Sequence, residues 1–181
     1  WLRRDIRDSG SGKTGTTNVL RTAGKIPAGL VMILDVAKGA VPALVGRLVF
    51  DNDGAAVAGA CASVVGHIWP VFAEFRGGRG VASTYGGVLG LAPLVSLGFP
   101  VIGAVLVIAT RYVSVMSVVG VPLCAALMAV AAAFGWTEWV YVVFAVFATA
   151  LVEYKHIPNI KRLLDGTEPK IGQGGGSPAT G

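Results

Sequence analysis

The chain has 181 residues, a length that predicts a single domain. Only 14% of its residues are charged and 54% are hydrophobic, whereas soluble domains carry about 25% charged residues. This composition excludes a disordered chain and a disulfide scaffold. The net charge of +5 does not indicate a nucleic-acid-binding domain, because the basic residues stand between long apolar runs. A membrane protein is the better interpretation.

Six apolar stretches follow one another along the chain, and a bilayer core about 30 Å thick needs roughly 20 helical residues. The stretches are 26–49, 54–73, 80–94, 97–110, 112–137 and 136–154. The uncharged run 80–110 is divided in two, since one helix of that length would reach about 46 Å and Pro93 and Pro100 offer a break. Because these stretches do not alternate apolar and polar residues, helices are favoured over barrel strands. We therefore expect an all-α integral membrane protein, a polytopic helical bundle with six visible spans.

The positions of the basic residues indicate how the spans are oriented. With two spans in the run 80–110, the segments 1–25, 74–79, 111 and 155–170 fall on one side, which then holds 13 of the 15 basic residues. The positive-inside rule makes this side cytoplasmic. Residues 1–171 form the predicted membrane domain, and 172–181 are a predicted flexible tail.

The first polar segment, residues 10–21, contains Gly-Lys-Thr, which is suggestive of a Walker A loop. That motif needs a glycine five positions before Gly12, where this chain has Arg7, and no apolar strand precedes it. Open glycine backbone, hydroxyl groups and Arg21 nevertheless suit a bound anion. The alternative is a juxtamembrane loop whose basic residues only set the topology.

The intramembrane pair Asp35 and Lys38 stands three residues apart in the first stretch, on one helix face. Charges inside a membrane are costly and are usually paired or functional. Pairing at this spacing is geometrically possible. We interpret the two residues as a structural pair; the alternative is a direct role along a substrate pathway.

The second polar segment, residues 67–80, ends in Arg-Gly-Gly-Arg-Gly at the start of a predicted helix. Free backbone N–H groups, the helix dipole and two guanidinium groups there favour a phosphate. The alternative is a simple cytoplasmic turn. His67 lies on an apolar helix, so packing or a structural hydrogen bond is a better interpretation than catalysis.

The third polar cluster joins residues 111–114 with residues 153–164. His156 could relay a proton near neutral pH, and Asn159 could orient it or donate to an oxyanion. Pro158 lies between them and argues against an uninterrupted helix. The alternative is an interfacial helix that carries only a topology signal. Cys61 and Cys124 lie inside apolar runs without metal or redox spacing, and are interpreted as packing residues.

Four blocks together resemble one family, the bacterial acyl-phosphate-dependent glycerol-3-phosphate acyltransferases of the PlsY type. They are GSGKTGTTNVLRTAGK, HIWPVFAEFRGGRGVAS, RYVS and HIPNIKRLLDGTEPKIG. The resemblance implies a bacterial inner-membrane enzyme of seven helices, the first of which would precede Trp1. It also implies transfer of a fatty acyl group from acyl phosphate to the 1-hydroxyl of glycerol 3-phosphate, giving lysophosphatidic acid and phosphate. No metal or other cofactor is implied, and we expect a monomer in the lipid bilayer with no nucleic-acid partner.

The resemblance also implies roles for individual residues. The expected catalytic residues are Ser11, Arg21, Ser114, His156 and Asn159. The expected phosphate-binding residues are Lys13, Asn18, Arg76, Gly77, Gly78, Arg79 and Gly80. The expected structural residues are Asp35, Lys38 and Glu168. Lys13 stands where the family often has Asn, and Arg76 and Arg79 where it usually has Lys; arginine and lysine differ in binding geometry.

An acyl phosphate already has a good leaving group, so the enzyme mainly needs positioning and charge neutralisation. We expect direct attack by the glycerol hydroxyl, with either His156 or the substrate phosphate as the base. The main alternative is a small transporter or channel for an anionic metabolite, with the basic loops as its vestibule. A non-catalytic scaffold is disfavoured by the clustered Ser, His, Asn and Arg residues.

Overall fold

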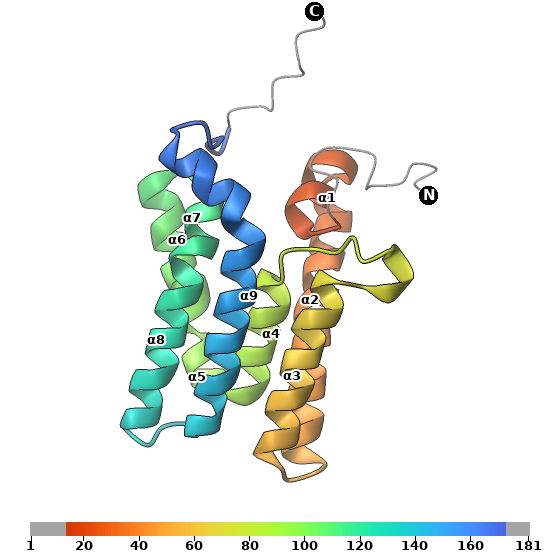
Figure 1. Ribbon diagram of the computed structural model, residues 1–181, viewed down its shortest axis with the longest axis vertical. Coiled ribbons are helices and arrows are strands. Elements are labelled where there is room, and N and C mark those ends of the chain that lie inside the picture. Colours follow the sequence, from red (N-terminus) through yellow and green to blue (C-terminus); the bar gives the residue numbers. More distant parts are fainter. Residues whose placement is uncertain (1–13, 173–181) are drawn as a thin grey trace, which may run out of the picture.

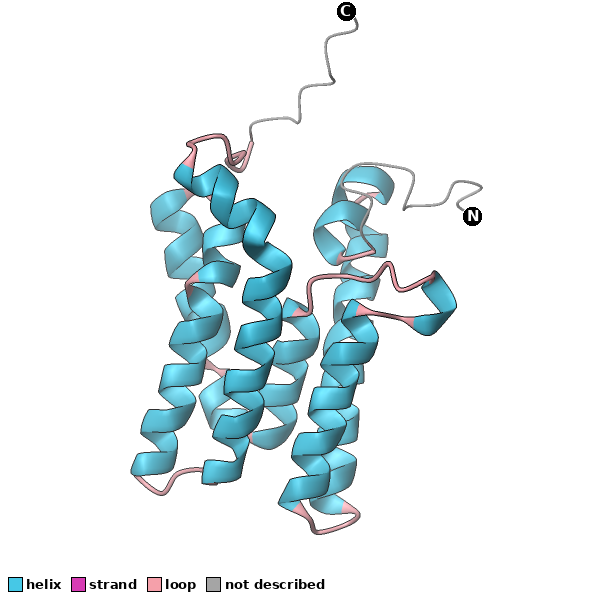
Figure 2. Ribbon diagram, in the orientation of Figure 1, coloured by secondary structure: helices cyan, strands magenta, loops and turns pink. Residues whose placement is uncertain are grey.

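The computed structural model describes residues 14–172, and the regular elements in that range are all helices (Figures 1 and 2). Ser11, Lys13 and residues 173–181 of the predicted tail lie outside the described residues. The elements are α1 (Thr16–Ala23), α2 (Lys25–Leu48), α3 (Asp53–Ile68), η2 (Val71–Ala73), α4 (Val81–Leu91), α5 (Pro93–Ser96), α6 (Gly98–Thr110), α7 (Val113–Val118), α8 (Gly120–Ala133) and α9 (Trp139–Leu164). The predicted all-α bundle is confirmed.

Five helical segments in the described range are long and apolar enough to cross a membrane. They are Lys25–Leu48, Asp53–Ala73, Pro93–Thr110, Val113–Ala133 and Trp139–Leu164. Each corresponds to one predicted span. The segment Pro93–Thr110 joins α5 to α6, and Val113–Ala133 joins α7 to α8.

The remaining predicted span, residues 80–94, is shorter than predicted. The stretch 80–94 forms α4, which has 11 residues and is therefore about 16 Å long, roughly half the thickness of a bilayer core. It ends at Ala92 because the next residue, Pro93, begins α5 at a position where its missing N–H is not needed. Pro100, expected to help break the run, lies instead in the first turn of α6.

The chain passes back and forth so that the polar segments meet at one end of the bundle (Figure 1). In this view α1, the junction between α6 and α7, and the end of α9 lie at the upper end, and the loop before α4 lies just below α1. The turns after α2, α4 and α8 lie at the opposite end. This agrees with the orientation that the basic residues predict.

The packing of α2 against α4 depends on glycine. A methyl group on Gly39 of α2 would overlap the backbone oxygen of Ser83, and one on Gly86 of α4 would overlap the backbone oxygen of Val36. Small residues allow helix backbones to approach this closely, which favours association in a membrane. The short α4 is therefore fixed against α2 along its length.

Arg47 is a basic residue at the end of the bundle opposite the other basic residues. Its Nη1 donates hydrogen bonds to the carbonyl oxygens of Gly90 (3.2 Å) and Leu91 (3.0 Å). These are the last carbonyls of α4, which have no partner within the helix and carry its partial negative charge. Arg47 therefore lies away from the other basic residues because it caps the C-terminal end of α4.

α9 continues through Pro158 without interruption, so the expected break there is wrong. Pro158 removes one backbone donor but leaves the surrounding turns helical, and the upper part of α9 bends in Figure 1. The buried positions recur every three or four residues along the helix, which is the period of one helix face. They are Tyr141, Phe144, Ala145, Ala148, Val152, His156 and Asn159.

The α2–α4 contact predicts that one glycine substitution destabilises the protein and that a second one in α2 does not. Gly86→Ala is expected to lower the free energy of unfolding by about 1–3 kcal/mol, because the added methyl group overlaps a backbone atom that cannot move independently. Gly29→Ala in α2 is the matched control, since its added methyl group meets no atom within 4 Å. Thermal unfolding of the detergent-solubilised protein measures both. Equal midpoints for the two variants would contradict this account of the packing.

Candidate active site

The face of α9 that is buried in the bundle carries two of the predicted catalytic residues. His156 is 1% exposed and Asn159 is 3% exposed, although both lie in the last third of the helix near its polar end. Because α9 is continuous, the spacing of three residues places them on neighbouring turns of one face. The sequence expected this spacing but not the unbroken helix that makes it effective.

His156 is oriented by its own helix. Its Nδ1 lies 2.8 Å from the carbonyl oxygen of Val152, one turn earlier. A carbonyl oxygen can only accept a hydrogen bond, so Nδ1 carries the proton in the neutral ring. Nε2 is then the basic nitrogen, which is the form that a proton acceptor requires.

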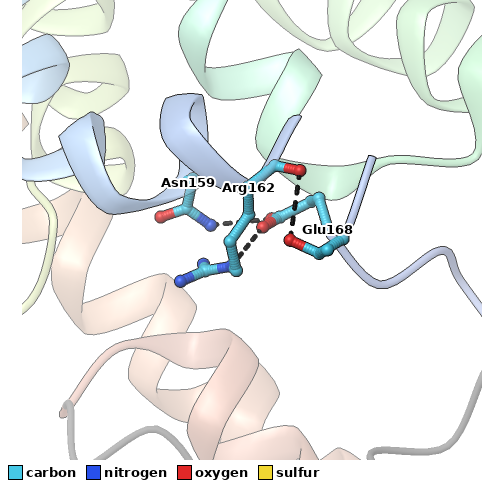
Figure 3. Close-up of polar contacts among 4 residues, drawn as sticks. Asn159, Arg162 and Glu168 are labelled. Atoms are coloured by element: carbon cyan, nitrogen blue, oxygen red, sulfur yellow. Dashed lines mark hydrogen bonds and ion pairs between the residues drawn. The ribbon is translucent and has the colours of Figure 1, made fainter. Parts of the chain in front are cut away.

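Asn159 is held by the carboxylate of Glu168 (Figure 3). Glu168 follows the end of α9, where the chain turns back towards the helix. Asn159 Nδ2 donates to Oε1 of Glu168 over 2.7 Å, and Arg162 Nε donates to Oε2 over 2.7 Å. Gly166, with φ of +69°, provides the left-handed turn that ends the helix. Glu168 therefore holds two side chains of α9 at once.

The Glu168 carboxyl is kept ionised by these contacts. Burial is the largest single influence and acts to raise the pKa of Glu168, but Asn159, Ser114 and Arg162 together outweigh it, and the net pKa is lowered. The Ser114 hydroxyl, on α7, belongs to this group although it does not meet the full geometry of a hydrogen bond. Ser114 itself is 4% exposed, so its hydroxyl is a buried polar group close to the carboxylate.

The loop before α4 brings a cation to the same place. Arg79 is partly buried, and its Nε has no hydrogen-bond partner among residues 14–172. Burial lowers the pKa of Arg79; the negative charge of Glu168 opposes this, while the positive charges of Arg162 and Arg21 add to it. The electrostatic coupling thus links this loop to the end of α9 and to α1.

α1 contributes the remaining described part of the first polar segment. Asn18 is 3% exposed, whereas Arg21 is exposed and acts on Arg79 through its charge. The buried hydroxyl of Thr16 has no hydrogen-bond partner in the described range. Gly15 is the N-cap of α1, and its carbonyl oxygen accepts a hydrogen bond from the backbone N–H of Asn18 at 3.0 Å.

In the second polar segment, residues 67–80, the glycines before α4 are buried, whereas Arg76 is exposed. Gly77, Gly78 and Gly80 are buried, and Gly80 has φ of +87° at the start of α4, a conformation that favours glycine. Arg76 is exposed. The structure therefore distinguishes the two arginines of this loop, which the sequence treated as equivalent.

The predicted structural pair forms deeper in the bundle. Lys38 Nζ lies 2.6 Å from Oδ1 of Asp35, with Asp35 buried and the Lys38 side chain 44% exposed. Asp35 has a second partner, His67 of α3, whose Nδ1 is 3.4 Å away. The charge of Asp35 is thus compensated inside the membrane domain.

The structure brings five of the predicted site residues into one polar cluster at the upper end of the bundle. They are Arg21, Arg79, Ser114, Asn159 and Glu168. Arg162 belongs to the same cluster and was not among the predicted site residues, although its spacing of three from Asn159 was a usable signal. Arg76 has no described link to the cluster.

The cluster has the chemistry of an anion site. In this cluster Arg79 Nε and Ser114 Oγ are buried donors without a hydrogen-bond partner in the described range. Buried polar groups normally find a partner, so such donors at one end of a bundle suit a ligand rich in oxygen atoms. Within residues 14–172, no three His, Cys, Asp or Glu side chains are placed to hold a metal ion.

Comparison with known proteins identifies the family of this chain. Residues 1–166 match the family model described as glycerol-3-phosphate acyltransferase. The chain is 43% identical to a glycerol-3-phosphate acyltransferase of Thermoanaerobacter sp. (strain X514) over 169 residues, which cover 93% of this chain and 83% of the relative. It is 45% identical to that of Parasynechococcus marenigrum (strain WH8102), with 96% of this chain and 80% of the relative covered.

Two crystal structures of PlsY, an integral membrane glycerol 3-phosphate acyltransferase, have the same fold. The glycerol 3-phosphate form superimposes with a TM-score of 0.87 at 36% sequence identity, covering 94% of this chain and 84% of that one. The lysophosphatidic acid form gives a TM-score of 0.84 at 36% identity, covering 91% and 82%.

The carboxylate of Glu168 predicts a stability difference that depends on pH. Its folded pKa lies below the ordinary value of 4.5, so the stabilisation is present above that pH and is lost as the pH falls below it. Glu168→Gln is expected to lower the free energy of unfolding by about 1.5–3 kcal/mol at pH 7, since hydrogen bonds to a charged group are lost. Thermal unfolding of both proteins between pH 7 and pH 3 measures the gap. A gap that does not narrow in acid would contradict the role of the charge.

Proposed function

This chain belongs to the glycerol-3-phosphate acyltransferase family, and we propose from that membership the reaction that its site performs. It is an integral membrane acyltransferase that acts on glycerol 3-phosphate and yields lysophosphatidic acid. The proposed donor is an acyl phosphate, and the proposed acceptor is the 1-hydroxyl of glycerol 3-phosphate. Inorganic phosphate is the second product.

The observation that carries the proposal is the balance of charge in the polar cluster. The charges of Arg21, Arg162 and Glu168 all act on Arg79, so these three arginines and one carboxylate sum to +2. A phosphate monoester carries about −1.5 to −2 at neutral pH. A bound glycerol 3-phosphate would therefore neutralise the cluster, and the buried donors of Arg79 and Ser114 supply hydrogen bonds for it.

The proposed chemistry is a direct acyl transfer. The 1-hydroxyl oxygen attacks the acyl carbonyl carbon and forms the new ester bond. The bond between that carbon and the phosphate oxygen breaks, and phosphate leaves with the electron pair. The hydroxyl proton passes to the base. No covalent acyl-enzyme is needed, because acyl phosphate is already activated and the site mainly positions and neutralises the reactants.

Two groups can serve as the base, and both stay open. His156 presents Nε2 as its basic nitrogen, because Nδ1 donates to Val152. The alternative is the phosphate group of the substrate itself. Asn159, held through Nδ2 by Glu168, is proposed to orient the reacting groups from the adjacent turn of α9.

The polar cluster is proposed to face the cytoplasm, in a bacterial inner membrane. The basic residues at that end support this orientation through the positive-inside rule. The substrates carry phosphate, while the product has an acyl chain that suits the apolar bundle below. The transporter alternative lacks comparable support, since the polar groups gather at one end and the relatives are named as acyltransferases.

Purified protein in lipid, given acyl phosphate and labelled glycerol 3-phosphate, is expected to form labelled lysophosphatidic acid and phosphate. The variant His156→Ala tests the identity of the base. It is expected to lower kcat about 100-fold or more if the imidazole accepts the proton. Thin-layer chromatography of the labelled lipid and a phosphate assay measure the two products. No product from the wild-type protein would overturn the proposed function. Full turnover by the variant would leave the substrate phosphate as the base.

Arg79→Ala is expected to raise KM for glycerol 3-phosphate about tenfold or more, because the substrate phosphate loses a charged and buried donor. Lys161→Ala removes a positive charge from an exposed position of α9 at the same end of the bundle. This control variant should keep KM within about twofold, since screened surface charges contribute little. Initial rates at saturating acyl phosphate measure both, and equal KM values would contradict the assignment of Arg79.

A further inference from the structure

We propose that Asp35 and His67 are positioning residues for the phosphate-binding loop. In this proposal they form a rigid support inside the membrane domain against which Gly77 and Gly78 lie, and the support fixes where Arg79 enters the site. The proposal rests on the proposed function, because it assigns these residues an effect on glycerol 3-phosphate binding. Neither residue touches the substrate.

The support begins with a buried carboxylate. Asp35 lies in α2 and is 6% exposed, and its Oδ1 contacts Lys38 Nζ at 2.6 Å and His67 Nδ1 at 3.4 Å. The backbone beside this pair is also tied to α3, because Ser63 Oγ donates to the carbonyl oxygen of Lys38 at 2.6 Å. α2 and α3 are thus joined at the level where the loop enters.

His67 connects that carboxylate to the loop. The ring is 8% exposed and lies with Nδ1 towards Asp35. Its other nitrogen, Nε2, faces Gly78 so closely that a methyl group on Gly78 would overlap it. The backbone of His67 binds the same loop, since its carbonyl oxygen accepts the N–H of Gly78 at 3.2 Å.

Gly77 meets a different part of the same residue. A methyl group on Gly77 would overlap the backbone oxygen of His67, and would lie 2.6 Å from Cδ of Pro70. Both glycines are therefore needed for close approach, one to the ring and the other to the backbone. This difference allows the contribution of the ring to be separated from that of the backbone.

The geometry has a consequence for binding. A carboxylate at Nδ1 fixes the orientation of an imidazole ring, as it does for histidines that must hold one direction. The fixed ring then determines how deeply the backbone of Gly78 lies in the bundle. Because Arg79 is the next residue, its position is determined as well. A site is only as precise as the groups that support it. Loss of the ring should loosen the loop and weaken phosphate binding without touching the reacting atoms.

The first test separates positioning from general damage. His67→Ala is expected to raise KM for glycerol 3-phosphate about tenfold, with kcat changed less than about threefold and KM for acyl phosphate unchanged. Asp35→Asn should have the same pattern with a smaller effect, since an amide oxygen can still accept from Nδ1. A purely structural role would lower the active fraction and hence the apparent kcat, with KM unchanged. That result would overturn the proposal.

The second test uses the two glycines as a matched pair. Gly78→Ala should raise KM strongly in the wild-type background and add less than about twofold in the His67→Ala background, because the overlapping ring is gone. Gly77→Ala should be equally harmful in both backgrounds, since it meets the backbone oxygen. An undiminished Gly78→Ala effect in the absence of the ring would overturn the proposal.

His67→Asn provides the same test if His67→Ala does not accumulate as folded protein. The asparagine amide places a polar group where Nδ1 stood, so Asp35 keeps a partner, but nothing replaces Nε2. The overlap with the methyl group of Gly78→Ala should therefore be relieved in this variant too. Failure of the two ideas is distinguishable. A wild-type protein that forms no lysophosphatidic acid refutes the proposed function, whereas an active wild-type protein whose variants keep the wild-type KM refutes only this inference.

Discussion

A charged side chain at the centre of a bilayer costs roughly 2.5–3.5 kcal/mol on insertion scales, and this cost determines where the ionisable residues of this chain lie. Asp35 is inside the bundle, with Lys38 and His67 as partners. Arg47 reaches the carbonyl groups at the end of α4. The other basic residues of the described range gather at the opposite end, where they are free to form a site. The topology and the active site thus have one physical origin.

The polar cluster holds one anion, Glu168, among several cations. Burial and the positive charges of Arg162 and Arg21 all disfavour the charged form of Arg79. Glu168 compensates part of this, and it does so from a short segment that returns after α9 ends. Because one carboxylate stands against three arginines, Glu168 neutralises the cluster incompletely. The remaining positive charge is the driving force available for a phosphate ligand.

Properties that depend on local composition could be predicted from the sequence. The apolar runs predict the helices, and the basic residues predict the end at which the polar segments meet. Properties that depend on contacts between distant segments could not be predicted. The length of α4 could not be predicted, because its packing through Gly39 and Gly86 makes a full span unnecessary. The part played by Arg162 likewise depends on its contact with Glu168, which the spacing of residues does not reveal.

The glycine loop shows why such a site is built partly from residues without side chains. Gly77 and Gly78 bring the backbone against His67, so that the chain enters the bundle instead of passing over its surface. An arginine that follows such a loop is drawn into a partly buried place, where its charge is worth more to a ligand than at the surface. Arg76, before the glycines, stays exposed, and Arg79, after them, does not. The two glycines therefore decide which of two identical side chains lies at the proposed phosphate site.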